Sequence, residues 1–181
     1  MFTTRFDLSM LRFMNPVDVY VKRLSDLKTA FLDTEVVENI LKRYNPPVYI
    51  VEKFQTSNED NNLIFSSTTL FPGTVGREFY FTQGHYHMRE FAEIYFCLKG
   101  KGILLLKNND DEHVLDFEKG VVAHIPGSWG HRVVNVGKEV LVFVSIYPTN
   151  AGFDYDRLKN EGGFRTRVLT HREKGWELWT Q

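Results

Sequence analysis

The chain has a single cysteine, Cys97, among its 181 residues. A disulfide within the chain is therefore excluded, and we expect Cys97 to be a small buried residue. The first residues also lack the basic segment and apolar run of a secretory signal. Together these absences favour a reducing compartment, and the sequence predicts a cytoplasmic protein.

Long apolar runs and an excess of charge of one sign are missing as well. No stretch approaches the roughly 20 apolar residues needed to cross a bilayer, so we expect no membrane partner. The 22 Lys and Arg against 23 Asp and Glu give a formal net charge of -1 and are scattered along the chain. This pattern excludes a strong nucleic-acid footprint, and an anionic ligand would have to be held by local groups.

Helical periodicity is scarce. One helix is predicted from Asp33 or Thr34, either a good N-cap, up to the Pro46-Pro47 pair that cannot continue it. Ser25 to Lys28 predicts a single helical turn, and short extended pieces are expected before Val21. We expect no other substantial helix.

Beyond Pro47 the sequence consists of β-rich runs separated by turn signals such as Pro72-Gly73 and Lys119-Gly120. The predicted strands are 48–54, 63–71, 78–82, 93–98, 103–107, 113–117, 121–125, 132–136 and 140–147, with shorter runs at 166–169 and 176–179. Many short strands at this cadence predict a mostly β protein, a sandwich or small barrel. The length suits one domain. Trp129, Trp176 and Trp179 are interpreted as packing residues.

The segment from Gly84 to Tyr95 gathers the chemically active side chains. In an extended strand His85 and His87 point to the same face, and Glu93 begins a following strand whose inner face can meet them. A turn from Pro126 delivers His131, the best placed of the remaining histidines. Imidazole and carboxylate ligands suit a first-row transition metal. The other histidines, at 113, 124 and 171, are interpreted as surface, edge or core residues.

These residues resemble the two motifs of the cupins. Gly84-His85-Tyr86-His87, Glu93 and Gly100 are similar to the first motif, and the second is matched by Gly120, Pro126, His131 and Asn135. The gap from His87 to Glu93 is longer than usual, and Ser128 replaces a common glycine. The resemblance implies a double-stranded β-helix, or jelly-roll barrel, in a single cupin domain over 1–181. Its expected parts are an N-terminal arm and helix at about 1–46, the barrel at about 47–149 and a C-terminal extension at about 150–181.

A closer resemblance, from about Arg23 to Tyr155, is to the cupin-type phosphoglucose isomerases of archaea and some bacteria. It is carried by segments such as Thr68 to Gly73, Phe81 to His87 and Ile146 to Tyr155. It implies a metal-dependent, reversible isomerisation of glucose 6-phosphate and fructose 6-phosphate. It also implies a homodimer, with the N-terminal strands as the expected contact, since an open sheet leaves edges that a partner can cover.

The resemblance assigns roles to individual residues. The implied metal ligands are His85, His87, Glu93 and His131, holding one divalent metal per subunit, with ferrous iron expected and nickel, manganese or zinc as alternatives. The implied phosphate contacts are Tyr49, Thr68, Thr82, Gly84, Tyr147 and Tyr155. Glu93 and Tyr95 are the implied catalytic residues, and Phe153 stands where a close relative carries a histidine near the sugar.

Two mechanisms and two other functions stay open from the residues. A base such as Glu93 can move a proton through a cis-enediol, but a carboxylate on a metal is a weaker base, so a hydride shift competes. A cupin dioxygenase would use the same metal site. A non-catalytic sugar-phosphate-binding cupin would use the same cavity.

Overall fold

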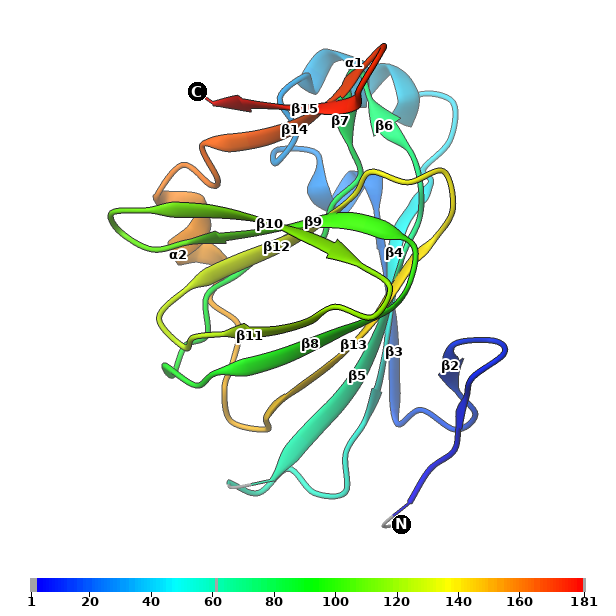
Figure 1. Ribbon diagram of the computed structural model, residues 1–181, viewed down its shortest axis with the longest axis vertical. Helices are drawn as coiled ribbons and strands as arrows, with labels where there is room; N and C mark the ends of the chain where they lie inside the picture. Colours follow the sequence, from blue (N-terminus) through cyan, green and yellow to red (C-terminus); the bar gives the residue numbers. More distant parts are fainter. Residues whose placement is uncertain (1–2, 61, 181) are drawn as a thin grey trace.

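A computed structural model describes residues 3–60 and 62–180, and antiparallel strands dominate it (Figure 1). The helical elements are η1 (Leu24–Leu27), α1 (Thr34–Leu41) and α2 (Tyr155–Asn160). The strands are β1 (Phe6–Asp7), β2 (Arg12–Phe13), β3 (Asp18–Arg23), β4 (Pro47–Phe54), β5 (Leu63–Leu70), β6 (Thr74–Val75), β7 (Glu78–Phe79), β8 (Glu93–Lys99), β9 (Lys101–Lys107), β10 (Glu112–Glu118), β11 (Val122–Ile125), β12 (Gly130–Asn135), β13 (Leu141–Pro148), β14 (Thr166–His171) and β15 (Gly175–Thr180). No helix among the described residues is long and apolar enough to span a membrane.

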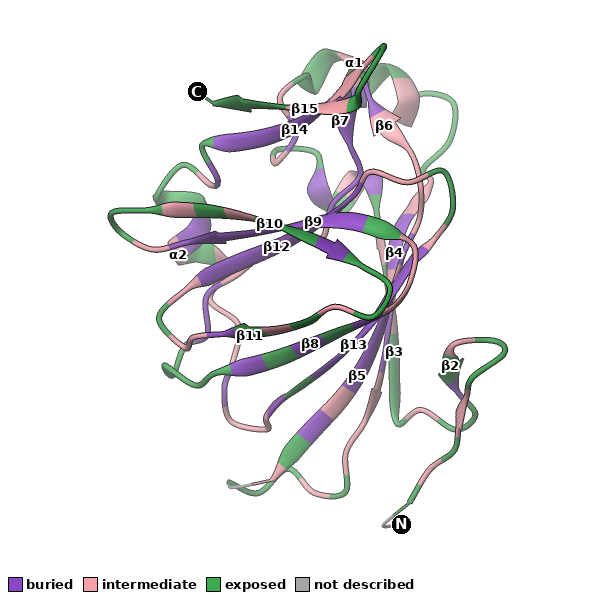
Figure 2. Cartoon of the chain, viewed as in Figure 1, coloured by how far each residue is buried: buried purple, intermediate pink, exposed green. Residues whose placement is uncertain are grey.

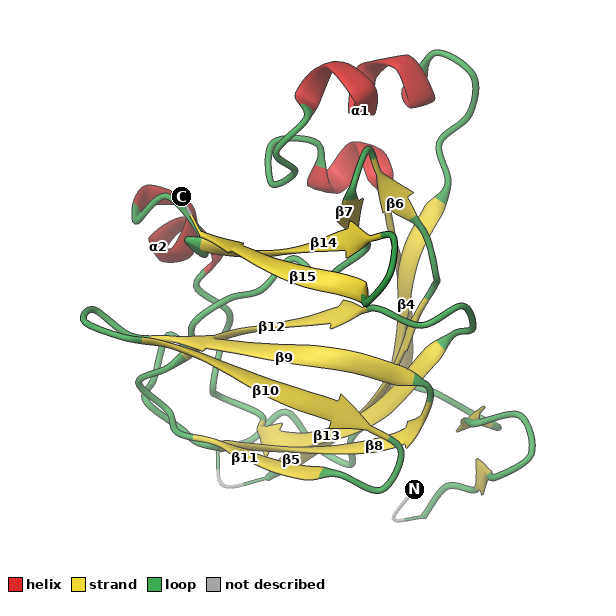
Figure 3. Ribbon diagram, turned by 45° about the horizontal axis from the view of Figure 1, so that its top comes forward, coloured by secondary structure: helices red, strands yellow, loops and turns green. Residues whose placement is uncertain are grey.

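Two sheets form the barrel. One has the strand order β11-β8-β13-β5-β4-β3, and the other has the order β10-β9-β12. The chain crosses between them, with β8, β11 and β13 in the first sheet and β9, β10 and β12 in the second. This is a jelly-roll arrangement, and it confirms the predicted cupin fold. A smaller sheet, β15-β14-β7-β6, lies at one end of the barrel beside α1 (Figure 3).

The alternation of side chains explains why the strands pack as they do. In β8, Glu93, Tyr95 and Cys97 are buried, whereas Ile94 and Phe96 are exposed. The buried faces of both sheets meet in one apolar core, seen as the purple stretches of Figure 2. Inward-pointing polar residues of β8 therefore lie inside the barrel and not on its surface.

The N-terminal and helical predictions are largely confirmed. Asp33 caps α1 by accepting a hydrogen bond from Val36 N at 2.9 Å, and the expected turn near Ser25 is the short helix η1. The arm contributes β3, which pairs with β4 along its length and extends the larger sheet.

Two expectations are wrong. The structure has a second helix, α2, capped by Asp154, whose side chain accepts from Arg157 N at 2.8 Å. Its apolar periodicity is too short to see in the sequence, because Leu158 is its only buried residue among those described. Trp179 is 43% exposed on β15, so it is not a packing residue.

Candidate metal centre and its cavity

Four side chains converge inside the barrel from three parts of the chain. His85 and His87 lie in the segment between β7 and β8, Glu93 begins β8, and His131 lies in β12. One ligand atom from each lies within 4.8 Å of all the others. The backbones of His85 and His131 bridge each other through two hydrogen bonds of 3.0 and 3.3 Å. This bridge fixes the two rings side by side.

Backbone carbonyls orient two of the imidazoles. His87 Nδ1 lies 2.6 Å from Phe91 O, and His131 Nδ1 lies 3.2 Å from Trp129 O. A carbonyl oxygen only accepts, so each Nδ1 must carry the hydrogen. In a neutral ring the opposite atom, Nε2, then presents a lone pair to the centre of the cluster, as metal-bound histidines do.

The residues fit a metal ion. Among the described residues, His85 Nε2, His87 Nε2, His131 Nε2 and Glu93 Oε2 are all buried without a hydrogen-bond partner. Glu93 Oε2 lies 3.2 Å from His131 Nε2 and 3.4 Å from His87 Nε2. Buried polar atoms are rarely left unpaired, and three imidazoles with a carboxylate are a suitable donor set for a divalent transition metal.

The electrostatics of the cluster favour the metal-binding forms of His85 and Glu93. Burial, and next the nearby His131 and His87, hold the pKa of His85 well below its usual range, so this ring is neutral. Burial alone would raise the pKa of Glu93, but its interactions with His131 and His87 outweigh burial and lower it. Burial alone would lower the pKa of His87, but its interactions with Glu93 and Phe91 outweigh burial and raise it, so a metal ion would displace a proton at that ring.

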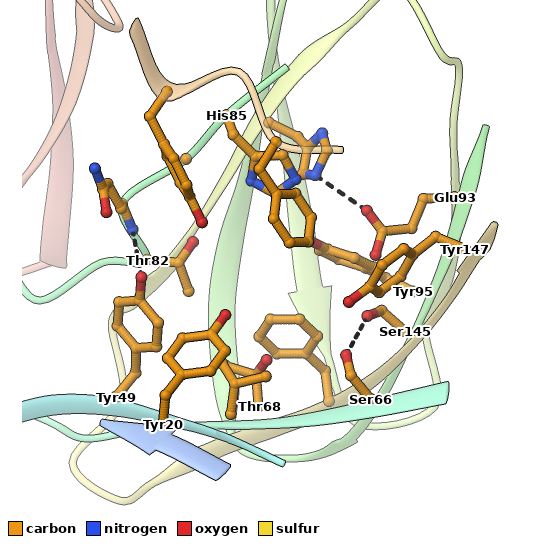
Figure 4. A pocket seen from close by; sticks show the side chains of 17 residues that line it. Tyr20, Tyr49, Ser66, Thr68, Thr82, His85, Glu93, Tyr95, Ser145 and Tyr147 are labelled. Carbon is orange, nitrogen blue, oxygen red and sulfur yellow. Dashed lines mark hydrogen bonds and ion pairs between the residues drawn. The ribbon is translucent and has the colours of Figure 1, made fainter. Parts of the chain in front are cut away.

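A polar cavity opens beside this cluster, and it collects all of the predicted phosphate contacts. Tyr49, Thr68, Thr82, Gly84, Tyr147 and Tyr155 line it, together with the predicted catalytic Tyr95 and with Phe153. Figure 4 shows Tyr49 of β4, Thr68 of β5 and Tyr147 of β13 on the walls of the cavity that also holds His85 and Glu93. Phe153 packs on His85 with ring centroids 4.4 Å apart.

Several lining residues escaped the sequence reasoning. Tyr20 reaches the cavity from β3, Gln83 lies beside Gly84, and Ser66 and Ser145 share a hydrogen bond of 2.7 Å across β5 and β13. A serine or tyrosine in a strand looks like any other strand residue. Alternation of side chains along β5 could have identified Ser66, because residues two apart in a strand point to the same face and Ser66 therefore lies beside Thr68.

The cavity offers neutral donors and no cation. None of the described lining residues is Lys or Arg. Burial is the main cause that raises the pKa of Tyr49, Tyr95 and Tyr147 above the usual value, so their hydroxyls stay protonated. The cavity can therefore hold an oxyanion by hydroxyl and backbone N–H donors.

A two-sheet jelly roll with three inward histidines and a glutamate around an internal cavity defines a cupin with a candidate metal centre. Residues 21–180 match the model of the family described as glucose-6-phosphate isomerase (GPI). The chain therefore belongs to the glucose-6-phosphate isomerase family, and it is an enzyme.

The relatives agree with this assignment. The glucose-6-phosphate isomerase of Thermococcus onnurineus is 44% identical over 87% of this chain and 82% of its own, and that of Pyrococcus horikoshii is 43% identical over 78% and 76%. A bacterial relative with the same name, from Sinorhizobium medicae, is 35% identical over 87% and 75%. Oxalate decarboxylase from Bacillus subtilis is structurally similar with a TM-score of 0.48 at 22% identity, over 58% of this chain and 26% of its own. The last likeness is too weak to carry an argument.

Proposed function

We propose that this protein catalyses the reversible isomerisation of glucose 6-phosphate and fructose 6-phosphate with one divalent transition metal per subunit. The observation that carries the proposal is the set of four unpaired, buried ligand atoms beside a hydroxyl-lined cavity. The curated relatives bear the name of this activity. Family membership favours it over the dioxygenase and the non-catalytic alternatives.

In this proposal the phosphate group lies among the threonine and tyrosine hydroxyls and the Gly84 amide. Thr68 of β5 points into the cavity, and Thr82 Oγ1 accepts a hydrogen bond from Val133 N at 3.0 Å, which leaves its own hydrogen free to donate. Tyr49 OH likewise accepts from Gln83 N at 3.4 Å. The Thr82 and Tyr49 hydroxyls are thus held by backbone N–H groups, with their own protons available to the ligand.

The reacting carbons would lie near Glu93 and Tyr95. A divalent metal held by His85, His87, Glu93 and His131, with ferrous iron expected, would supply a Lewis acid that stabilises negative charge on the sugar oxygens. We assign Glu93 as the base that moves a proton between the two carbons through a cis-enediol. Tyr95 stays protonated and can donate a hydrogen bond to a developing oxyanion.

A solvent-isotope experiment separates this route from a hydride shift. Reaction in heavy water should place deuterium on the carbon that receives the proton, because a carboxylate base exchanges its proton with solvent. Product free of deuterium after the reaction has reached equilibrium would favour the hydride shift instead.

The activity assay mixes purified protein with fructose 6-phosphate and measures glucose 6-phosphate. We expect conversion after loading with ferrous iron, nickel, manganese or zinc, and loss of conversion with a chelator. Absence of product with each of these metals would refute the isomerase assignment, whereas oxygen uptake would point to a dioxygenase.

The phosphate assignment has a matched pair of variants in adjacent positions of β5. Thr68→Val should raise KM for fructose 6-phosphate by about tenfold, the value of roughly one lost hydrogen bond to a charged group. Thr69→Val is the control, since neighbouring strand residues point to opposite faces and Thr69 does not line the cavity. Equal KM values for the two variants would place the phosphate elsewhere.

We also propose a homodimer formed through the N-terminal strands. β3 is an edge strand of the larger sheet, and its Val19 and Val21 are 50% and 40% exposed. An unpaired edge with apolar side chains invites a second strand. Light scattering should give the mass of two chains for the wild type and of one chain for the Val19→Lys/Val21→Lys variant; a monomeric wild type would contradict the proposal.

A further inference from the structure

A second and larger cavity adjoins the metal centre. Its volume is about 470 Å³, and Gln83, Gly84 and Tyr155 line both this cavity and the one beside the metal cluster. The remaining walls come from the segment around η1, from α2 with the glycines that follow it, and from β12 and β14. This volume is within the range of small-molecule sites in proteins.

Arg132 of β12 forms one wall and is only 5% exposed. Its guanidinium carbon lies 4.1 Å from the centroid of the Phe81 ring and 5.0 Å from that of Phe164, and Nη2 donates to Gln83 O at 2.8 Å. Its Nε is buried with no hydrogen-bond partner in the described part of the chain. A buried cation with a free donor is costly unless something pairs with it.

Arg167 of β14 lines the same cavity and is 8% exposed. Nη1 donates to Ala30 O at 2.7 Å and lies 3.1 Å from Glu78 Oε1, while Nε is again buried without a partner among residues 3–60 and 62–180. Burial and next the charge of Arg167 lower the pKa of Arg132 to about 9, which places the two cations within electrostatic reach of each other. Glu78 forms an ion pair with Arg167, and the charges of Glu78 and Glu112 offset part of the lowering of the Arg132 pKa, but neither carboxylate forms an ion pair with Arg132 among the described residues.

The other charged groups that line this cavity lie on exposed parts of η1 and α2. Lys159, exposed on α2, adds a third positive charge. Of the two carboxylates that also line the cavity, Asp26 already accepts a hydrogen bond from Arg23 N at 2.8 Å, and Asp156 is exposed on the first turn of α2. Among the described residues, neither Asp26 nor Asp156 forms an ion pair with Arg132 or Arg167, so the ion pair of Arg167 with Glu78 is the one that neutralises a buried guanidinium of this cavity.

We propose that this second cavity binds a small metabolite bearing a phosphate or carboxylate group, held by Arg132 and Arg167. Guanidinium groups match the planar or tetrahedral oxygens of such anions, and the volume exceeds what an inorganic ion needs. The site adjoins the proposed catalytic phosphate site and shares the wall formed by Gly84 and Tyr155, but it differs in its buried arginines, since none of the described residues that line the metal-side cavity is Lys or Arg. Arg132 also holds Gln83 O and follows His131, so a bound anion contacts the wall shared with the metal centre.

Crystals soaked in selenate provide the direct test, because selenium can be located by anomalous scattering. We expect a peak within hydrogen-bond distance of the Arg132 and Arg167 side chains. Absence of that peak from crystals in which selenate occupies the cavity around Thr68 and Thr82 would overturn the proposal.

Thermal unfolding with increasing anion provides the test in solution. Inorganic phosphate, glycerol 3-phosphate and malonate serve as probes. A larger rise in Tm with glycerol 3-phosphate would indicate a phosphate site, and a larger rise with malonate would indicate a carboxylate site. Glu78→Gln/Arg167→Met removes both charges of the buried pair and should weaken the response about tenfold, and Lys159→Ala a few fold. Lys138→Ala, on an exposed turn remote from the cavity, is the control.

None of these substituted residues lines the metal-side cavity, so anion bound there contributes equally to all variants. Identical anion dependence in the wild type and all three variants would refute the second site. Because the readout is stability, this result is independent of whether the enzyme isomerises hexose phosphates.

Discussion

At the scale of single residues, Gly84 shows why the metal motif needs a glycine. Its φ is +76°, a conformation that side chains disfavour. A Cβ at this position would lie 3.0 Å from His131 O, 3.1 Å from Leu158 Cδ2 and 3.2 Å from Arg132 Cβ. The backbone must pass this close for His85 to reach the cluster.

Gly84→Ala should therefore cost stability twice, through the backbone conformation and through crowding. We expect a loss of about 1–3 kcal/mol in urea unfolding together with weaker metal binding, because His85 must shift. Gly120→Ala is the matched control, since its φ is +95° but no atom lies within 4 Å of the added Cβ. Equal losses in both variants would show that crowding at Gly84 is unimportant.

At the scale of elements, Glu112 ties the start of β10 to the start of β14. Its two carboxylate oxygens accept hydrogen bonds from Arg165 N and Thr166 N, both at 2.8 Å. Burial alone would raise the pKa of Glu112, but these hydrogen bonds outweigh burial and lower it. The small end sheet is thus attached to the barrel by an ionised side chain.

This attachment predicts a pH dependence of stability. A carboxyl whose pKa is lower in the folded state stabilises the fold above its unfolded pKa of about 4.5, and that contribution is lost as the pH falls through the folded pKa. Glu112→Gln should be less stable than the wild type at pH 7, and the difference should shrink below about pH 4. Urea unfolding at both pH values measures it, with Glu118→Gln, on the exposed end of β10, as control; a difference that does not change with pH would contradict the assignment.

At the scale of the whole molecule, the candidate metal centre takes its residues from both sheets of the barrel. Glu93 belongs to the six-stranded sheet and His131 to the three-stranded sheet, while His85 and His87 lie in the chain that enters β8. A ligand that binds the folded state alone stabilises it by mass action.

Removing metal with a chelator should therefore lower Tm, and adding ferrous iron, nickel, manganese or zinc back should raise it with the logarithm of metal concentration. His131→Ala should remove this dependence, whereas His124→Ala, on an exposed position of β11, should keep it. If the Tm of the wild type does not change with metal concentration, the cluster holds no ion.

The strand and turn pattern of the sequence by itself predicted a mostly β sandwich or small barrel, and the resemblance to the cupins implied the jelly-roll fold and the four residues of the cluster. Alternation along strands puts His85 beside His87 and sends Glu93 and Tyr95 inward, and turn residues divide the strands. Sequence reasoning missed the features whose role depends on contacts with distant parts of the chain. The helix α2 has too few residues to show an apolar pattern in the sequence. Tyr20 lines the cavity only because β3 pairs with β4.

The second cavity is the clearest case of a feature decided by tertiary structure. Arg132 and Arg167 lie 35 positions apart and look like ordinary charged strand residues in the sequence. Folding buries both against one cavity and leaves the Nε of each without a hydrogen-bond partner among the described residues. This burial costs free energy, because the Nε groups lose the hydration that they would keep in an isolated strand. Spacing along the chain can predict ligands that share a strand or a turn. Which polar groups become buried from solvent depends on how the strands pack in the folded barrel.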